Sequence, residues 1–191
     1  SLRNIVNGSY IETCSETKYD LLEPWIQWVS IHTGKSAEEH KIYRLGDCTN
    51  SEVAQIYEII ESRGYKVGAI SPMNTDNRLK KPTFFIPDPW TKTNSDGSFW
   101  SKIIASTISK IVNTNANNNI NILDMLKLII ILIRFAKIKN YLSYVFYALT
   151  SIRRKWRKAL FLDLLLSDIY LSLLKYYNPD FSTLFLNSCA H

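Results

Sequence analysis

The side chains best suited to chemistry gather in residues 23–42, EPWIQWVSIHTGKSAEEHKI. Two histidines, His32 and His40, flank a Thr-Gly pair there, and Glu23 opens the stretch. Imidazole can bind a metal or transfer a proton near neutral pH, but a single histidine without further ligands binds metal poorly. We therefore interpret His32 as a packed or surface side chain. His40 follows two glutamates, and we expect it to pair with a carboxylate or to cap the turn.

Three charged residues further along could bind an anionic substrate or shape a turn. Asp88 lies between two prolines after an apolar run, so it either caps that turn or faces a cleft beyond the run. Asp47, in RLGDC, leaves the same two alternatives open. Arg44 could hold a substrate anion through two parallel hydrogen bonds, although a solvated arginine is the simpler interpretation.

The most basic part of the chain is RRKWRK, which runs from Arg153 to Lys158. Five cations around one tryptophan would suit an anion, a membrane surface or a protein partner, whereas the simpler interpretation is the exposed face of a helix. We expect no nucleic-acid binding, because neither an aromatic RNA-recognition platform nor a zinc finger is evident. The oligomeric state stays open.

The composition is that of one globular domain with a core of its own. The chain has 191 residues, 46% of them hydrophobic and 21% charged, with a net charge of +6 and a pI near 9.2. Three cysteines far apart favour a reducing compartment over a disulfide framework. Because no signal peptide or spanning helix is evident, we predict a cytoplasmic protein. The run LIIILIRFA, residues 128–136, is too short to span a membrane and is predicted to be a buried helix.

Hydrophobic spacing predicts the helices and strands that would position these residues. A first helix is expected over residues 25–34, and a second from Asn50 or Ser51, either of which can cap it, to Gly64. The other expected elements are strands at 65–70, 83–86 and 181–187, a helix at 100–112, an Asn-rich linker at 113–121, and a helical region at 122–177 with breaks near 139–140 and 151. The apolar stripes of residues 122–150 are expected to form core, or an interface if they stay exposed.

Strands separated by helices favour an α/β fold, with a parallel-type sheet flanked by helices. The composition of successive segments divides the chain into three parts. We predict an α/β core segment at residues 1–99, a mainly helical insertion or cap at 100–177, and a returning core strand at 178–191.

The order of these features resembles the alkaline phosphatase superfamily, in particular its type I phosphodiesterase/nucleotide pyrophosphatase branch. The resemblance rests on PWIQWVSIHTGKSAEEHKI, GYKVGAISPMN, FFIPDPW and YNPDFSTLFLN, and it covers about residues 17–90 and 176–191. It implies an alkaline phosphatase-like core in which the helix at 25–34 directly follows a strand and points its first turn at an ion-binding hollow. We expect the chain to be a fragment of a longer hydrolase-like protein.

The resemblance also implies metal-dependent hydrolysis of a small anionic ester, either a phosphate or a sulfate ester. A divalent metal, zinc above all, would act as Lewis acid. The family's nucleophile falls on Pro24, which has no hydroxyl. Glu23 could then act as a base or metal ligand, and Thr17 or Ser15 could supply a hydroxyl from a shifted loop.

Two substrate-binding candidates, Arg44 and Asp88, and one metal ligand, His191, complete the implied site. If Pro24 abolishes turnover, the alternative is a catalytically inactive protein of that fold that binds an anionic ligand or a protein partner. A third alternative is a purely structural protein with a helical cap.

Overall fold

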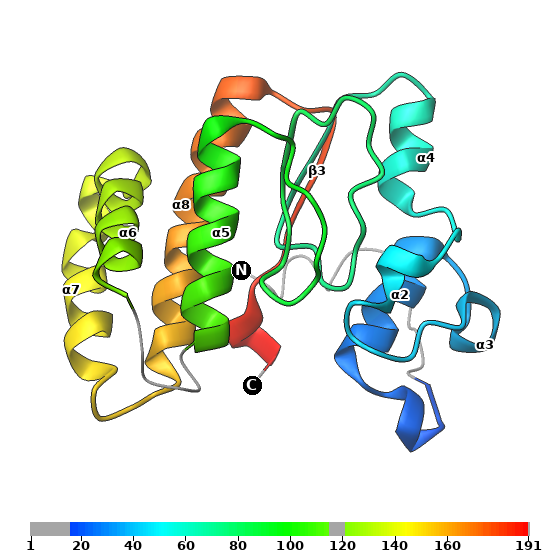
Figure 1. Cartoon of the computed structure of the whole chain (residues 1–191), viewed down its shortest axis with the longest axis horizontal. Helices are drawn as coiled ribbons and strands as arrows, with labels where there is room; N and C mark the ends of the chain where they lie inside the picture. Colours follow the sequence, from blue (N-terminus) through cyan, green and yellow to red (C-terminus); the bar gives the residue numbers. More distant parts are fainter. Residues whose placement is uncertain (1–15, 115–120, 191) are drawn as a thin grey trace, which may run out of the picture.

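The computed structural model describes residues 16–114 and 121–190, in which helices surround a small sheet (Figure 1). Its strands are β1 (Val67–Ile70), β2 (Phe84–Ile86) and β3 (Phe181–Leu184). Its α-helices are α2 (Pro24–Thr33), α3 (Ala37–His40), α4 (Ile56–Ser62), α5 (Phe99–Thr114), α6 (Ile122–Phe135), α7 (Tyr141–Thr150) and α8 (Arg157–Tyr177). Short 3-10 helices are η1 (Tyr19–Leu21), η2 (Asp47–Asn50), η4 (Ile138–Asn140) and η5 (Asn187–Ala190).

The three strands form one sheet in the order β2-β1-β3, and both neighbouring pairs are parallel. In the centre of the sheet, Gly68 pairs with Phe84 on one side and with Ser182 on the other. The predicted α/β class, with a parallel sheet flanked by helices, is therefore confirmed. An alkaline phosphatase-like core stays a prediction, because three short parallel strands are common to many α/β folds.

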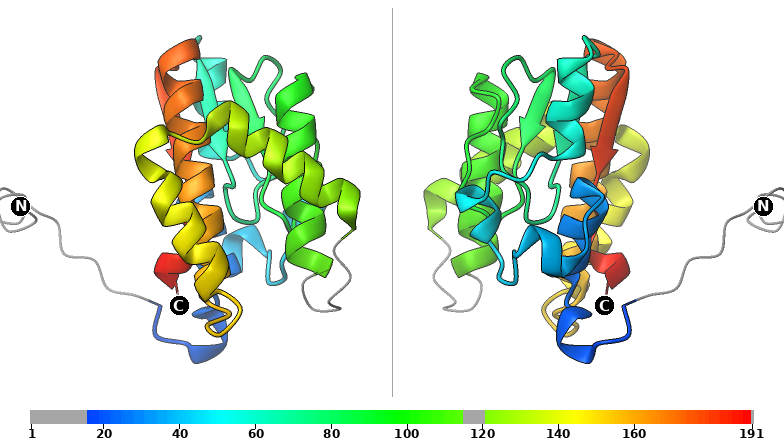
Figure 2. Two further views of the ribbon diagram at one scale, coloured as in Figure 1. Left: turned by 90° about the vertical axis from the view of Figure 1, so that its left-hand side faces the viewer. Right: turned by 90° about the vertical axis from the view of Figure 1, so that its right-hand side faces the viewer.

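Helices cover both faces of the sheet (Figure 1, Figure 2). On one face α5 contacts β2 and α8 contacts β3, and α6 and α7 pack on the far side of these two helices. On the other face α4 contacts β1, and α2 packs beside α4. The sheet is thus buried from both sides, as its almost wholly apolar strands β1 and β2 require.

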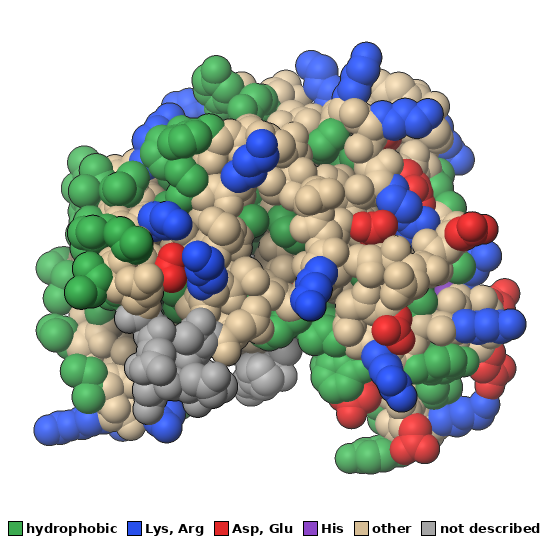
Figure 3. Space-filling model, viewed as in Figure 1, with side chains coloured by type: hydrophobic (Ala, Val, Ile, Leu, Met, Phe, Trp, Pro, Cys, Tyr) green, Lys and Arg blue, Asp and Glu red, His purple; other side chains and the backbone are tan. Residues whose placement is uncertain are grey.

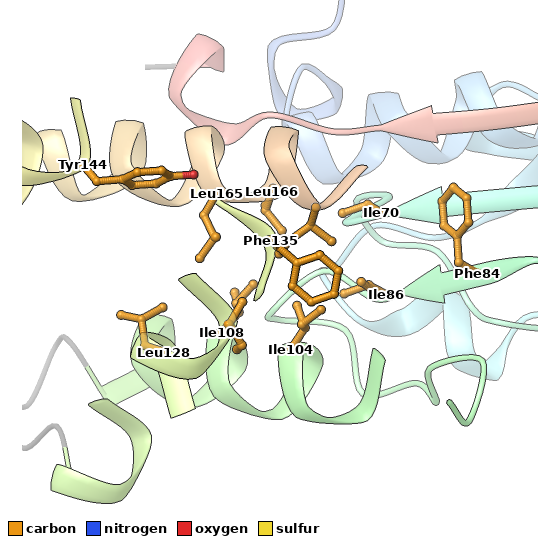
Figure 4. Close-up of a cluster of buried hydrophobic side chains, with 12 residues drawn as sticks. Ile70, Phe84, Ile86, Ile104, Ile108, Leu128, Phe135, Tyr144, Leu165 and Leu166 are labelled. Carbon is orange, nitrogen blue, oxygen red and sulfur yellow. The ribbon is translucent and has the colours of Figure 1, made fainter. Parts of the chain in front are cut away.

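The larger core lies between the sheet and the helices α5 to α8 (Figure 4). Successive strand side chains point to opposite faces. Ile70 and Ile86 therefore enter this larger core, whereas Ala69 and Phe85 enter a smaller core with Tyr57 of α4. The predicted division of the chain at residues 99 and 177 stays a prediction, but side chains from both sides of it share the larger core.

The packing of the Phe84 ring across β1 requires glycine at position 68. A Cβ atom there would lie 2.5 to 2.8 Å from three ring atoms of Phe84. Phe84 is buried, and the rings of Tyr170 and Tyr177 lie 6.3 and 6.4 Å from its own. The phenyl ring therefore has little room to give way.

Two element boundaries differ from the prediction by three residues or more. The second helix, α4, begins at Ile56 and not near residue 50, because Gln55 and Glu58 form its capping box; the Gln55 amide donates to the Glu58 carboxylate at 2.6 Å. β3 ends at Leu184 and not at residue 187. Asn187 begins η5 instead, and its amide donates to the carboxylate of Asp163.

The breaks predicted near residues 139–140 and 151 are confirmed, since α6, α7 and α8 are separated there. Asp168 of α8 stabilises the chain at the first break, between α6 and α7. Its buried carboxylate accepts hydrogen bonds from the Lys137 amide, the Asn140 side-chain amide and the Tyr144 hydroxyl, each at 2.9 Å. Burial and this carboxylate together raise the pKa of the Tyr144 hydroxyl.

The prediction of a buried helix at residues 128–136 is wrong for one side of α6. Leu128 and Ile131 are buried, but Ile129 and Ile133 on the outer side are 47% and 72% exposed. Apolar partners from α5 and α8 reach only the inner side of the helix.

Within the described residues, no helix combines the length and the apolar character that crossing a membrane requires. Most of the predicted linker, residues 115–120, lies outside the described part.

Candidate functional site

The carboxyl ends of parallel strands are the usual place for ligands in α/β folds, and here they meet at one edge of the sheet. Asn74, which sequence reasoning did not select, connects this edge to α2. Its side-chain amide donates to the carbonyls of Trp25 and Arg44 at 2.9 and 3.2 Å, and its side-chain oxygen accepts from the Gly46 amide at 2.8 Å. Its φ of 50° is a left-handed conformation that asparagine tolerates better than most residues. Asn74 thus fixes the first turn of α2 beside the end of β1.

Asp88 caps the turn after β2, which is one of its two predicted roles. Its carboxylate accepts from the amides of Asn74, Trp90 and Thr91 at 2.8 to 2.9 Å and from the Thr91 hydroxyl at 2.6 Å. The side chain is 2% exposed, and burial raises its pKa while these hydrogen bonds oppose the shift. Because its oxygens are engaged in this way, Asp88 positions the strand ends. A substrate-binding role for it stays a prediction.

The other predicted site residues lie apart on the surface. Thr17 is exposed, and its amide donates to the Glu16 carboxylate at 2.8 Å. Glu23 is exposed at the N-cap of α2, where its side chain makes no capping hydrogen bond. The side chain of Arg44 is exposed, and only its carbonyl reaches Asn74.

Two further candidates, Ser15 and His191, lie outside the described residues. Pro24 stands at the start of α2, because its fixed φ suits the first turn of a helix. Residues 16–23 before it form η1 and irregular chain, so α2 does not directly follow a strand and that expectation is wrong. Its first turn still lies beside the carboxyl end of β1.

His32 belongs to a buried chain of hydrogen bonds between α2, α4 and β3. Its Nδ1 lies 2.8 Å from Thr75 Oγ1, and its Nε2 lies 3.3 Å from the Tyr57 hydroxyl, which is 3.1 Å from Thr183 Oγ1. Burial lowers the pKa of His32 to about 4. A neutral imidazole offers one donor and one acceptor, which matches these two partners. His32 is therefore a packed histidine, as predicted.

His40 and Ser30 form a pair that resembles a nucleophile and its base but has the wrong proton arrangement. The Ile42 amide donates to His40 Nδ1 at 3.0 Å, so the proton of the neutral ring is on Nε2, 3.1 Å from Ser30 Oγ. A base that activates serine must accept from the hydroxyl instead. Burial also lowers the pKa of His40, although Glu39 opposes this. His40 holds the turn after α3, which is one of its predicted roles.

The predicted metal ion has no ligand set in the described part of the chain. Across residues 16–114 and 121–190, no three side chains of His, Cys, Asp or Glu lie close enough together to hold one. The buried candidates among them, such as His32 and Asp88, are engaged by protein groups. Zinc or another divalent metal stays a prediction, and no chemical step is derived through it.

A pocket of about 490 Å³ adjoins the carboxyl edge of the sheet on the α5–α8 side. Ser71 and Phe185, which directly follow β1 and β3, line it together with Pro89 from the turn after β2. All four helices supply its walls, and the main apolar side chains are Ile108, Ile111, Leu128, Phe161, Leu162 and Leu166. A cavity of this size and character suits a small organic molecule.

The charged groups that line the pocket are predominantly positive. Lys155 and Lys158, both from the RRKWRK cluster, lie on its wall together with Asp163. The Asp163 carboxylate accepts from the amides of Asn187 and Ser188 at 3.1 and 2.6 Å and also from the Ser188 hydroxyl. Because backbone donors already compensate this carboxylate, the exposed Lys155 is the charge that a ligand would meet.

These features define an α/β protein with a three-stranded parallel sheet and an apolar pocket that lysines border. Comparison with protein-family models, with characterised proteins and with solved structures found no match for the chain. The resemblance to the alkaline phosphatase superfamily therefore stays a prediction that rests on the sequence motifs alone.

Sequence reasoning selected the lysines of the RRKWRK cluster as an anion contact but did not find the pocket beside them. The available signal was the set of apolar positions that recur at helical spacing through residues 100–112 and 122–166. That spacing indicates which side of a helix is apolar. It does not indicate that four such sides leave a space between them.

Proposed function

We propose that this protein binds a small amphipathic anion in the pocket between α5, α6, α7 and α8. The apolar part of the ligand would occupy the space beside Leu128 and Leu166, and its acid group would lie beside Lys155. The acid could be a carboxylate or a phosphate or sulfate ester, since lysine attracts each of these as a point charge. The observation that carries the proposal is the combination of about 490 Å³ of apolar space with lysines at its wall.

The apolar walls supply the affinity. Each methylene group moved from water into such a space contributes about 0.8 kcal/mol. An alkyl chain of about ten carbons therefore offsets the entropy cost of association, which is at least about 4 kcal/mol. Both the walls and the strand ends are held in place by the large core, so the pocket needs little reorganisation on binding.

Lys155 supplies the preference for an anion. Lys155 is exposed in the turn between α7 and α8. The carboxylate of Asp163 already accepts hydrogen bonds from the chain around Ser188. A carboxylate beside Lys155 gains a charge-assisted contact of about 0.2–1 kcal/mol at an accessible position. A neutral alcohol of the same length would gain none of this attraction.

Isothermal titration calorimetry with decanoate and decanol, both kept monomeric, tests the proposal. We expect one decanoate per chain and several-fold weaker binding of decanol. Lys155→Glu should reduce decanoate affinity and leave decanol affinity unchanged, whereas Ala159→Trp should block both ligands by filling the pocket. Arg154→Glu is the matched control, because this exposed neighbour does not line the pocket.

The absence of saturable binding by either ligand would contradict the proposal. Equal decanoate affinity in Lys155→Glu, Ala159→Trp and the unaltered protein would also contradict it, since the ligand would then bind elsewhere. Circular dichroism of each variant distinguishes loss of binding from loss of fold.

Hydrolysis of phosphate or sulfate esters is a separate prediction, because neither Thr17 nor Glu23 lines the pocket. It is tested with p-nitrophenyl phosphate, bis-p-nitrophenyl phosphate and p-nitrophenyl sulfate, with and without zinc or manganese. Turnover that disappears in Thr17→Ala or Glu23→Gln would support a hydrolase. No turnover and no bound metal would leave ligand binding as the function to pursue.

A further inference from the structure

The outer sides of α6 and α7 expose a continuous apolar surface, which we call the α6–α7 face. In Figure 2 (left) these two helices lie in front of α5 and α8, and in Figure 3 hydrophobic side chains gather over them. Its most prominent side chains, which come from these helices and from the chain just after each of them, are between 65% and 85% exposed: Ile122, Ile133, Ile138, Leu142, Leu149 and Ile152. Single exposed apolar residues are ordinary, but a contiguous surface of this kind marks an interaction site.

The exposed apolar positions follow the helical repeat. On α6, Leu126, Ile130 and Ile133 lie on the outer side while Ile131 faces the core. On α7, Tyr144 is buried against α8, and the opposite side is exposed. The inner sides alone complete the fold, so the apolar outer sides contribute nothing to the interior.

The charges around the α6–α7 face are predominantly positive, and the one carboxylate of α6, Asp124, pairs with Lys110 and Lys127. Between Met125 and Leu162 there are nine Lys and Arg residues and no Asp or Glu. Arg153 and Arg154 are exposed in the turn between α7 and α8. The guanidinium of Arg157 lies 4.8 Å from the ring centre of Phe146, at the edge of the apolar surface. Cations that border an apolar helical surface and share it with aromatic rings are typical of proteins that lie at a membrane interface.

We propose that the α6–α7 face docks on an anionic lipid bilayer. Its apolar side chains would enter the boundary between headgroups and acyl chains, and the surrounding Lys and Arg would contact lipid phosphates and carboxylates. A second copy of the chain is a poorer occupant, because it would bring the same positive residues against each other. The proposal does not depend on the pocket, since Ile133, Leu142, Arg153 and Arg154 do not line it.

Co-sedimentation of the protein with phosphatidylcholine vesicles, with and without phosphatidylserine at about one third of the lipid, tests the proposal. We expect at least about tenfold stronger partition into the vesicles that contain phosphatidylserine, and a loss of this preference as salt screens the charges. Size-exclusion chromatography with light scattering, without lipid, reports self-association in parallel.

Two double variants separate the contributions. Arg153→Glu with Arg154→Glu should remove the preference for anionic vesicles, at least about tenfold in partition coefficient. Ile133→Gln with Leu142→Gln should weaken partition by about tenfold, because two apolar insertions are lost. The matched controls are Lys80→Glu with Lys81→Glu and the single change Ile31→Gln, all at exposed positions on other parts of the surface. They should bind as the unaltered protein does.

The proposal is overturned if the protein does not sediment with anionic vesicles, or if it binds both kinds of vesicle equally. It is also overturned if the control variants lose as much binding as the α6–α7 variants. Self-association that Ile133→Gln with Leu142→Gln abolishes, without vesicle binding, would instead identify the face as an interface between copies.

Discussion

The imidazole of His32 lies among groups that match its neutral form. Thr75 and Tyr57 meet its two ring nitrogens, and the ring of Trp28 lies 5.7 Å from its own. Burial lowers its pKa from 6.5 to about 4. The unfolded chain therefore binds a proton at His32 at a higher pH than the folded chain does, and this difference makes stability depend on pH.

We predict that acidification destabilises the fold through His32. Because its folded-state pKa is depressed, its contribution is fully present above about pH 6.5 and is lost as pH falls toward 4, by about 3 kcal/mol over the whole window. Urea unfolding at several pH values measures this loss. In His32→Gln the free energy of unfolding should depend less on pH. His40 shifts in the same direction but is present in both proteins, so the difference reports His32. Equal dependence in the two would contradict the prediction.

The ring of Phe84 can lie across β1 because position 68 carries no side chain. At Gly68 the ring of Phe84 occupies the space in which a Cβ would lie. The two parallel strands therefore share a small-against-large contact at the centre of the sheet.

We predict that Gly68→Ala lowers the free energy of unfolding by about 1–3 kcal/mol, since the added methyl group overpacks an enclosed site. Phe84→Leu removes the ring atoms that this methyl group would meet. The double variant should therefore be more stable than the sum of the two single changes predicts. Urea unfolding of all four proteins measures the coupling. Strict additivity would show that the two positions do not compete for space.

The molecule as a whole has two unlike sides. In Figure 3 the acidic side chains lie mainly over α2 to α4, whereas the apolar surface gathers over α6 and α7. The helices α5 to α8 serve three purposes at once, because they cover the sheet, enclose the pocket and present the α6–α7 face. The pocket and the face are therefore neighbours, but Lys155 and Ala159, which test the pocket, are not among the residues that test the face.

We predict that Ile129→Gln, Ile133→Gln and Leu142→Gln together leave stability within about 1 kcal/mol, because these side chains are already 47% to 85% exposed. Ile131→Gln on the inner side of α6 is the matched control. It places an amide where the side chain is 0% exposed and should cost about 3 kcal/mol or more. Thermal unfolding followed by circular dichroism compares them. A large loss in the triple variant would mean that the α6–α7 face is part of the folded interior.

Local patterns predicted the elements whose limits depend on neighbouring residues. α2 begins at Pro24 and ends before Gly34. The strands β1 and β2 lie within the apolar runs that predict them. The predicted start of α4 was wrong because Asn50 and Gln55 can each cap the beginning of a helix, and the structure uses Gln55. The carbonyl of Asp76, which accepts a hydrogen bond from the Gln55 side chain and so helps to hold this cap, is 21 positions away.

The candidate site was less predictable than the fold. Asp88 was correctly given a turn-capping role, because proline and aspartate signal a turn by themselves. Asn74 was missed because its partners, Trp25, Arg44 and Gly46, are 28 to 49 positions away along the chain. Nothing in the residues beside Asn74 indicates those contacts.

The amino-acid sequence by itself determined where helices and strands form and that the sheet is parallel in type, since hydrophobic spacing and turn residues act over a few positions. Only the tertiary structure decided which side of α6 stays exposed and that α5 to α8 enclose a pocket at the strand ends. Burial depends on surfaces that distant segments bring together. A side chain such as Ile133 therefore has no fixed environment until its neighbours in space are known.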